Sequence, residues 1–84
     1  MVATANAVWD SILTTLKSEI SYSSFETWFQ DARPVALGDE SLTIAVPDPF
    51  TKGGIERRYR GMIEEIASES CDRPLALVIE IVKD

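Results

Sequence analysis

Four basic side chains within nine residues are the feature of this sequence that most suggests binding chemistry. They are Lys52, Arg57, Arg58 and Arg60, half of the chain's eight positive charges. Such a cluster attracts the phosphates of a single nucleic-acid strand or an acidic surface on a partner protein. The alternative is a solvated helix face, because Glu56–Arg60 and Arg60–Glu64 have the i,i+4 spacing of helical ion pairs. We favour the solvated face and keep weak single-stranded DNA binding as the second interpretation of these residues.

The residue types in this sequence do not favour catalysis. The chain has no His, the most common general base and metal ligand. Cys71 is the single cysteine, so no internal disulfide or cysteine-pair zinc site can form. Glu64 and Glu65 are adjacent, and adjacent helical residues point about 100° apart, so these carboxylates do not converge on one atom. We expect no enzyme, no catalytic residues and no metal site.

Composition indicates one globular domain over residues 1–84. Apolar residues make up 45% of the chain, and 14 acidic against eight basic residues give a net charge of −6. Such acidity disfavours tight binding of duplex DNA, which depends on neutralising phosphates. No apolar stretch approaches the roughly 18 residues of a membrane span, and the N-terminus lacks the basic segment of a signal peptide. We expect a cytoplasmic protein without a membrane partner.

The first predicted helix spans residues 5–20. Its apolar residues recur at helical spacing and form one stripe: Val8, Trp9, Ile12, Leu13, Leu16 and Ile20. Asn6 or Thr4 would cap its start, since a side-chain oxygen there accepts from a free backbone N–H. Trp9 lies on the stripe, which favours a place in the core.

The second predicted helix, over residues 22–31, carries aromatic residues on one face. These are Phe25, Trp28 and Phe29, at spacing i, i+3 and i+4, and we expect them to be mostly core. Ser21 and Ser23 are alternative N-caps. Ser23 begins an S-x-x-E capping box, whereas Ser21 would allow a hydrophobic staple around the first turn.

Three strands are predicted, over residues 35–37, 41–46 and 75–82. The first two form a hairpin around the turn residues Gly38-Asp39-Glu40. Alternation gives each strand one apolar face, made by Val35 and Leu37, by Leu42, Ile44 and Val46, and by Leu75, Leu77, Ile79 and Ile81.

A third helix is predicted from Asp48-Pro49 to about Ser70, since Asp caps a helix well and Pro suits its first position. Gly53-Gly54 weakens it by about 1 kcal/mol per glycine, so we expect a loose first turn and a stable helix from about Ile55. The element order is then α-α-β-β-α-β. This order predicts an α+β fold in which a three-stranded sheet packs against helices and the last strand lies parallel to a neighbour.

The order and spacing of several short motifs resemble the N-terminal domain of the bacterial replication initiator DnaA. The motifs are W-x₂-I-L-x₂-L-x₃-I-S-x₃-F-x-T-W-F from Trp9, then R-P, G-D-x-S-L-x-I-x-V-P, and F-x₄-I-x-x-R-Y from Phe50. The resemblance runs from about Val8 to Ile81. It implies a KH-like, non-catalytic domain that self-associates, recruits the replicative helicase and docks regulators of initiation at the chromosomal origin.

The resemblance also implies site residues. Trp9 matches a partly exposed contact for self-association, and a tryptophan is large enough to serve the core as well. The outer face of the second helix and the start of the third match a helicase-binding surface, which here comprises Ser24, Glu26, Thr27 and Phe50. The position of Ser24 is acidic in some members, so this chain either contacts its helicase differently or relies on Glu26. Gly53-Gly54 departs from the polar residue and tryptophan that are common in the family.

No cofactor is expected in this chain. The family's ATPase and duplex-DNA-binding domains lie further along its chains, and no G-x₄-G-K-[ST] loop for ATP occurs here. The alternative function is a stand-alone KH-like module that binds single-stranded nucleic acid. The net charge of −6 and the absence of the G-x-x-G loop of KH modules disfavour it.

Overall fold

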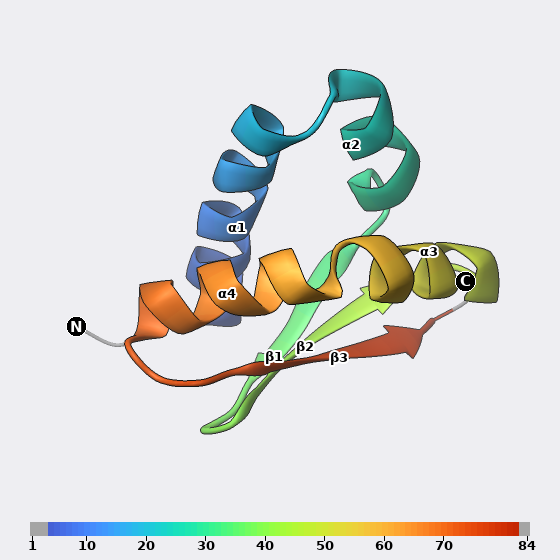
Figure 1. Ribbon diagram of the computed structural model, residues 1–84. Coiled ribbons are helices and arrows are strands. Elements are labelled where there is room, and N and C mark those ends of the chain that lie inside the picture. Colours follow the sequence, from blue (N-terminus) through green and yellow to red (C-terminus); the bar gives the residue numbers. More distant parts are fainter. Residues whose placement is uncertain (1–3, 83–84) are drawn as a thin grey trace.

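The structure of this chain is a computed structural model, and it describes residues 4–82. Its elements, in chain order, are α1 (Ala5–Glu19), α2 (Tyr22–Phe29), β1 (Arg33–Leu37), β2 (Ser41–Val46), α3 (Pro49–Arg58), α4 (Arg60–Cys71) and β3 (Ala76–Ile81) (Figure 1). The predicted α+β class, with a three-stranded sheet packed against helices, is confirmed. Within the described residues, no helix is both long and apolar enough to cross a membrane.

The sheet has the strand order β1-β2-β3. β1 pairs antiparallel with β2 in a hairpin, whereas β3 pairs parallel with β2, as predicted. A parallel pair needs a crossover, and α3 and α4 supply it. On β2 the residues Leu42, Ile44 and Val46 are buried, while their neighbours are half-buried, which confirms the predicted alternation.

β1 departs from simple alternation. Pro34 pairs with Ile44 and Ala36 pairs with Thr43, so one extra residue, Val35, forms a bulge. Val35 is therefore 49% exposed, and Pro34 stands on the inner face together with Leu37. The prediction that Val35 and Leu37 share one face is wrong, because the inserted residue reverses the alternation between them.

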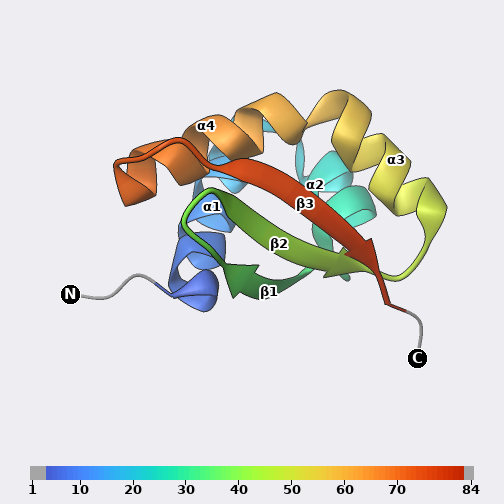
Figure 2. The same cartoon turned by 90° about the horizontal axis from the view of Figure 1, so that it is seen from below.

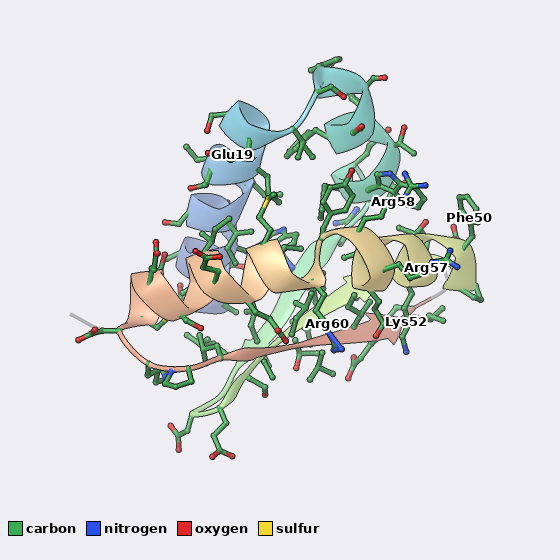
Figure 3. All side chains as sticks on the ribbon, in the orientation of Figure 1. Glu19, Phe50, Lys52, Arg57, Arg58 and Arg60 are labelled. Atoms are coloured by element: carbon green, nitrogen blue, oxygen red, sulfur yellow. The ribbon has the colours of Figure 1, made fainter. Side chains whose placement is uncertain are left out.

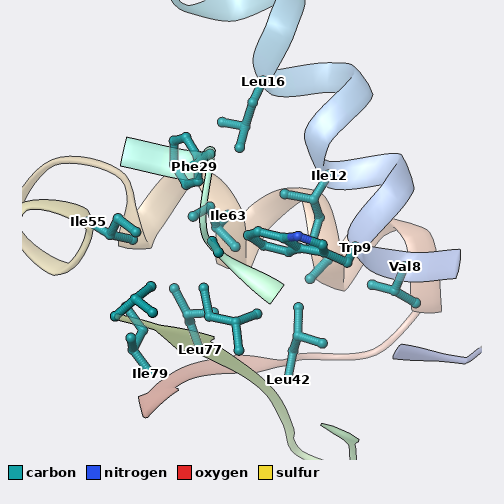
Figure 4. Close-up of a cluster of buried hydrophobic side chains, with 14 of the residues drawn as sticks. Val8, Trp9, Ile12, Leu16, Phe29, Leu42, Ile55, Ile63, Leu77 and Ile79 are labelled. Atoms are coloured by element: carbon teal, nitrogen blue, oxygen red, sulfur yellow. The ribbon is translucent and has the colours of Figure 1, made fainter. Parts of the chain in front are cut away.

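The helices cover one face of the sheet and leave the other uncovered (Figures 1 and 2). The buried side chains converge between helices and strands (Figure 4), and the largest of them are Trp9, Ile12, Leu16, Leu42, Ile44, Ile55, Ile63 and Leu77. On β3, Leu77 and Ile79 face this core as predicted, whereas Ile81 at the end of the strand is 39% exposed.

Trp9 belongs to this core. Its residue exposure is 2%, and its ring packs against Phe29 at a centroid distance of 6.3 Å. The expectation of a partly exposed indole is wrong, because position 9 lies in the middle of the α1 stripe that meets the sheet and α4. The indole Nε1 is buried and has no hydrogen-bond partner among residues 4–82.

The third helix differs from its prediction in two respects. It is helical from Pro49 through both glycines, neither of which has a positive φ, so the expected loose first turn is absent. Asp48 caps it by accepting from the Thr51 N–H at 2.7 Å. It also does not continue to Ser70 as one helix, because the chain bends at Tyr59 (φ −122°, ψ −8°). The bend allows α3 to pack against α2 and β3 while α4 packs against α1.

The structure also resolves the alternative N-caps. Thr4 caps α1, since its hydroxyl accepts from the Ala7 N–H at 3.1 Å. Ser21 caps α2 by accepting from the Ser24 N–H at 3.2 Å. The capping box that begins at Ser23 is not formed, because α2 starts at Tyr22 and Ser23 already lies inside the helix.

Candidate functional site

The centre of the candidate site is a contact between α2 and α3 in which Trp28 lies on Gly54. A Cβ atom on Gly54 would stand 2.1 Å from Cζ3 of the Trp28 ring, closer than any side-chain carbon can approach. Both residues are buried, with Trp28 8% exposed. The glycine that departs from the family pattern therefore serves as the floor on which this indole packs.

Phe50 stacks on the same indole from the start of α3. The two ring centroids are 5.4 Å apart and the planes are inclined by 28°. The guanidinium of Arg58 lies 5.5 Å from the Trp28 ring centroid. Phe50, Gly54 and Arg58 follow at spacing i, i+4 and i+8, so they share one face of α3. The indole thus lies across this face with an aromatic ring at one end and a cation at the other.

Phe50 is 71% exposed even though one side of its ring is packed. Its backbone is fixed in the first turn of α3, which begins with the Asp48 cap and Pro49. An aromatic ring held in place by a buried neighbour and open to solvent on the other side is a suitable anchor for a protein interface, because little conformational entropy remains to be lost. This exposure agrees with the match of Phe50 to a partner-binding surface that the resemblance implies.

The predicted residues of α2 do not lie together. Ser24 stands at i−4 from Trp28 and so shares the side of α2 that carries this indole, whereas Thr27 lies about 100° around the helix from Trp28. Ser24 is half-buried beside its hydrogen-bond partner Ser21, and Thr27 is exposed. Glu26 lies about 160° around the helix from Ser24, on the opposite side. Ser24 therefore lies on the Trp28 side of α2, Glu26 lies on the opposite side, and Thr27 lies between the two.

Glu26 instead belongs to a hollow at the corner between α1 and α2. The hollow has a volume of about 400 Å³ and is lined by Lys17, Tyr22, Phe25 and Glu26. The Tyr22 hydroxyl donates a hydrogen bond to Glu26 Oε1, and Lys17 Nζ lies 5.3 Å from the Phe25 ring centroid. Two effects of Glu26 raise the pKa of Tyr22 above the usual value for tyrosine. The larger is the hydrogen bond to the carboxylate, and the smaller is the negative charge of that carboxylate.

Tyr22 is 78% exposed and is not among the predicted site residues. Its position could have been found from the sequence, since it is the first residue after the Ser21 cap and lies opposite Trp28 on α2. Tyr22 and Phe50 are the two exposed aromatic residues near α2 and α3 in the described part of the chain. Tyr22 stands on the far side of α2 from Phe50.

The four predicted basic residues divide into two pairs (Figure 3). Arg57 and Arg58 are exposed at the end of α3, on the side that carries Phe50. Arg60 turns toward β3, where it donates to the Leu77 carbonyl and lies 3.9 Å from Glu56 and 3.7 Å from Glu64. Lys52 lies on the same side of the helices as Arg60. The two predicted i,i+4 ion pairs are confirmed, and they engage Arg60 in holding the fold.

Glu64 completes this contact with β3. Its Oε2 accepts from the Leu77 N–H at 2.8 Å, while Arg60 donates to the carbonyl of the same residue. Two side chains of α4 therefore satisfy both backbone groups of Leu77 on the outer edge of the sheet. In the described part of the chain, residues 4–82, no group of three or more His, Cys, Asp or Glu side chains is placed to hold a metal ion.

Comparison with known proteins connects this chain to a family. Residues 6–69 match the family model of the DnaA N-terminal domain. A chain in the crystal structure of a HobA–DnaA (domain I–II) complex from Helicobacter pylori has a similar fold, with a TM-score of 0.75 and 17% sequence identity. The similarity covers 89% of this chain and 98% of that one. The matched residues include Trp28, Phe50 and Gly54.

Proposed function

This chain belongs to the DnaA N-terminal domain family, and from that premise we propose that it is a non-catalytic protein-interaction domain that acts in the initiation of bacterial DNA replication. The family membership supports the process, and the exposed Phe50 stacked on Trp28 is the observation that supports the mode of action. A cytoplasmic location follows from this role.

We assign the recruitment of the replicative helicase to the surface made by Ser24, Thr27 and Phe50, with Arg57 and Arg58 at its edge. Phe50 supplies the apolar anchor, and the small hydroxyl side chains allow a partner to approach α2 closely. An aromatic anchor surrounded by polar groups is typical of interface hot spots. Glu26 contributes only if the partner reaches across α2 to the Tyr22 side.

Calorimetric titration of the cognate helicase tests this assignment. Truncating an interface anchor typically costs about 2 kcal/mol or more, so Phe50→Ala is expected to weaken binding roughly thirtyfold. The matched control is Tyr22→Ala, which removes a similarly exposed ring from the other side of α2. Loss in Phe50→Ala alone supports a surface centred on Phe50, and loss in both variants extends it to Glu26. Unchanged affinity of a folded Phe50→Ala chain contradicts the proposal.

Regulators of initiation and a second copy of the domain are the other proposed partners. The similar H. pylori chain was solved with HobA, which makes docking of a regulator a reasonable expectation for this fold. Weak self-association through Trp9 remains a prediction. Because that indole is buried, it would not touch the other copy directly.

Single-stranded DNA is a second candidate ligand. Phe50 could stack on a base while Arg57 and Arg58 approach the phosphates, which is the usual combination in single-strand sites. Lys52 and Arg60 lie on another side of the helices, so the site would hold fewer charges than the sequence suggested. Titration of labelled oligo-dT at low and physiological salt tests it, because binding that survives physiological salt favours this candidate.

A further inference from the structure

The face of the sheet turned away from the helices is uncovered and has an ordered pattern of side chains. Figure 2 looks onto this face, and the helices lie behind the strands. In the central rows it carries small or β-branched residues, namely Ala36, Thr43, Ala45 and Val78. Val78 is 42% exposed, and the burial of β3 alternates with the outward residues open to solvent. We call these residues, with Arg33 and Glu80, the open sheet face.

Two opposite charges flank the centre of the open sheet face. Arg33 of β1 pairs with Ala45, and Ala45 is also the register partner of Glu80 of β3. The three residues therefore form one row across the sheet, with a cation on one outer strand and an anion on the other. Strands lie about 4.8 Å apart, so the two Cα atoms are about 10 Å apart. Neither charge has an ion-pair partner within residues 4–82.

The next row has no charge. Ala36, Thr43 and Val78 lie side by side in the register, two residues along β2 and β3, and three along the bulged β1, from Arg33, Ala45 and Glu80. A two-fold axis parallel to β2 and in front of the open sheet face would exchange β1 with β3. It would place Arg33 of one copy opposite Glu80 of the other, twice, and would bring Ala45 against Ala45 and Ala36 against Val78. The face is thus complementary to itself.

We propose that the open sheet face binds the same face of a second copy of this chain in a symmetric, sheet-on-sheet dimer. The inference rests on the proposed self-association and assigns it to a surface away from α1. Isologous contacts require that each residue meet its counterpart under a two-fold rotation, and the Arg33–Ala45–Glu80 row meets this condition. Small central residues permit two sheets to pack at the usual spacing of about 10 Å.

The size of the face sets the strength of the dimer. Three strands of about five residues give a patch of roughly 15 by 17 Å. A standard stable interface buries about 800 Å² on each partner, so this dimer is weak and depends on a high local concentration. Each Arg33–Glu80 contact lies at the rim, where it fixes the register of the two sheets more than it adds affinity.

Sedimentation velocity of the 84-residue chain over a range of concentrations tests the dimer. The variants Arg33→Glu and Glu80→Arg each place like charges opposite one another and are expected to weaken association at least tenfold. Mixed in equal amounts, the two variants carry complementary faces, and the mixture is expected to associate at least as well as the wild type. The double variant Arg33→Glu, Glu80→Arg should also associate like the wild type.

Arg57→Glu is the matched control, because it makes the same charge change on an exposed site outside the open sheet face. It should leave association unchanged. The proposal is overturned if the wild-type chain stays monomeric at millimolar concentration, if either single variant associates like the wild type, or if the mixture stays monomeric with both chains folded by circular dichroism. Helicase binding by both single variants is measured in parallel. If the dimer proposal fails but both variants still bind the helicase, the proposed partner surface around Phe50 is not affected by that failure.

Discussion

The indole of Trp28 packs directly on Gly54, so that a methyl group on this glycine would stand 2.1 Å from the ring carbon Cζ3. This relationship joins α2 to α3 and fixes the surface on which Phe50 stacks. It also explains why a residue that weakens helices occurs inside one. The cost of about 1 kcal/mol for glycine in a helix is offset by burial of a large aromatic ring.

The two adjacent glycines of α3 should respond oppositely to alanine. Gly54→Ala forces the Trp28 ring to move, and overpacking of this kind typically destabilises a protein by about 1–3 kcal/mol. Gly53→Ala meets only Arg57 Nη2 at 3.8 Å, and its φ is not positive, so the higher helix propensity of alanine should stabilise by up to about 1 kcal/mol. Urea denaturation of both variants measures the difference. Equal midpoints would show that Trp28 can leave Gly54 without cost.

Truncation of Trp9 is expected to destabilise the whole domain. The side chain is 2% exposed, and replacing a buried aromatic residue by alanine costs about 3–5 kcal/mol, a large part of the stability of a small domain. Trp9→Ala should therefore lower the thermal midpoint strongly. Phe50→Ala, which removes a mostly exposed ring, is the control and should change it little. A wild-type midpoint for Trp9→Ala would contradict the core position of this indole.

The contact of α4 with the edge of the sheet can be followed at one amide. Glu64 accepts from the Leu77 N–H at 2.8 Å, and a hydrogen bond of this kind contributes about 1 kcal/mol. Glu64→Ala should therefore speed hydrogen exchange of the Leu77 amide roughly fivefold. Glu65→Ala is the matched control, because the adjacent carboxylate is exposed and makes no such bond. Exchange that is unaltered in Glu64→Ala would mean that the edge is protected by other groups.

The pKa of Tyr22 should depend on the negative charge of Glu26. The hydrogen bond to the carboxylate and its negative charge both disfavour the tyrosinate, which is why the pKa is raised. Glu26→Gln removes the charge, so the pKa of Tyr22 should fall toward the usual value of about 10. Site-resolved NMR titration measures it, with Glu65→Gln as a control that leaves Tyr22 unchanged. A pKa that does not fall in Glu26→Gln would exclude the negative charge of Glu26 as a cause.

Elements whose signals are local could be predicted from the sequence. The apolar stripe of α1, the alternation of β2 and the Asp48-Pro49 start of α3 all depend on residues that are neighbours in the chain. The parallel placement of β3 also followed, because a strand after a crossover helix has few other positions. The exposure of Phe50 agrees with the position that the family resemblance implies for it.

Only the tertiary structure decided the features that depend on which distant residues meet. Gly53-Gly54 suggested a loose turn, yet the helix passes through both, because Trp28 from α2 fills the space above Gly54. The bend at Tyr59 arises because α3 and α4 pack against different helices, a requirement that local propensity does not contain. The bulge at Val35 likewise comes from pairing with β2. The row of Arg33, Ala45 and Glu80 exists only through strand register, since these residues are far apart in the chain and are brought together by the sheet.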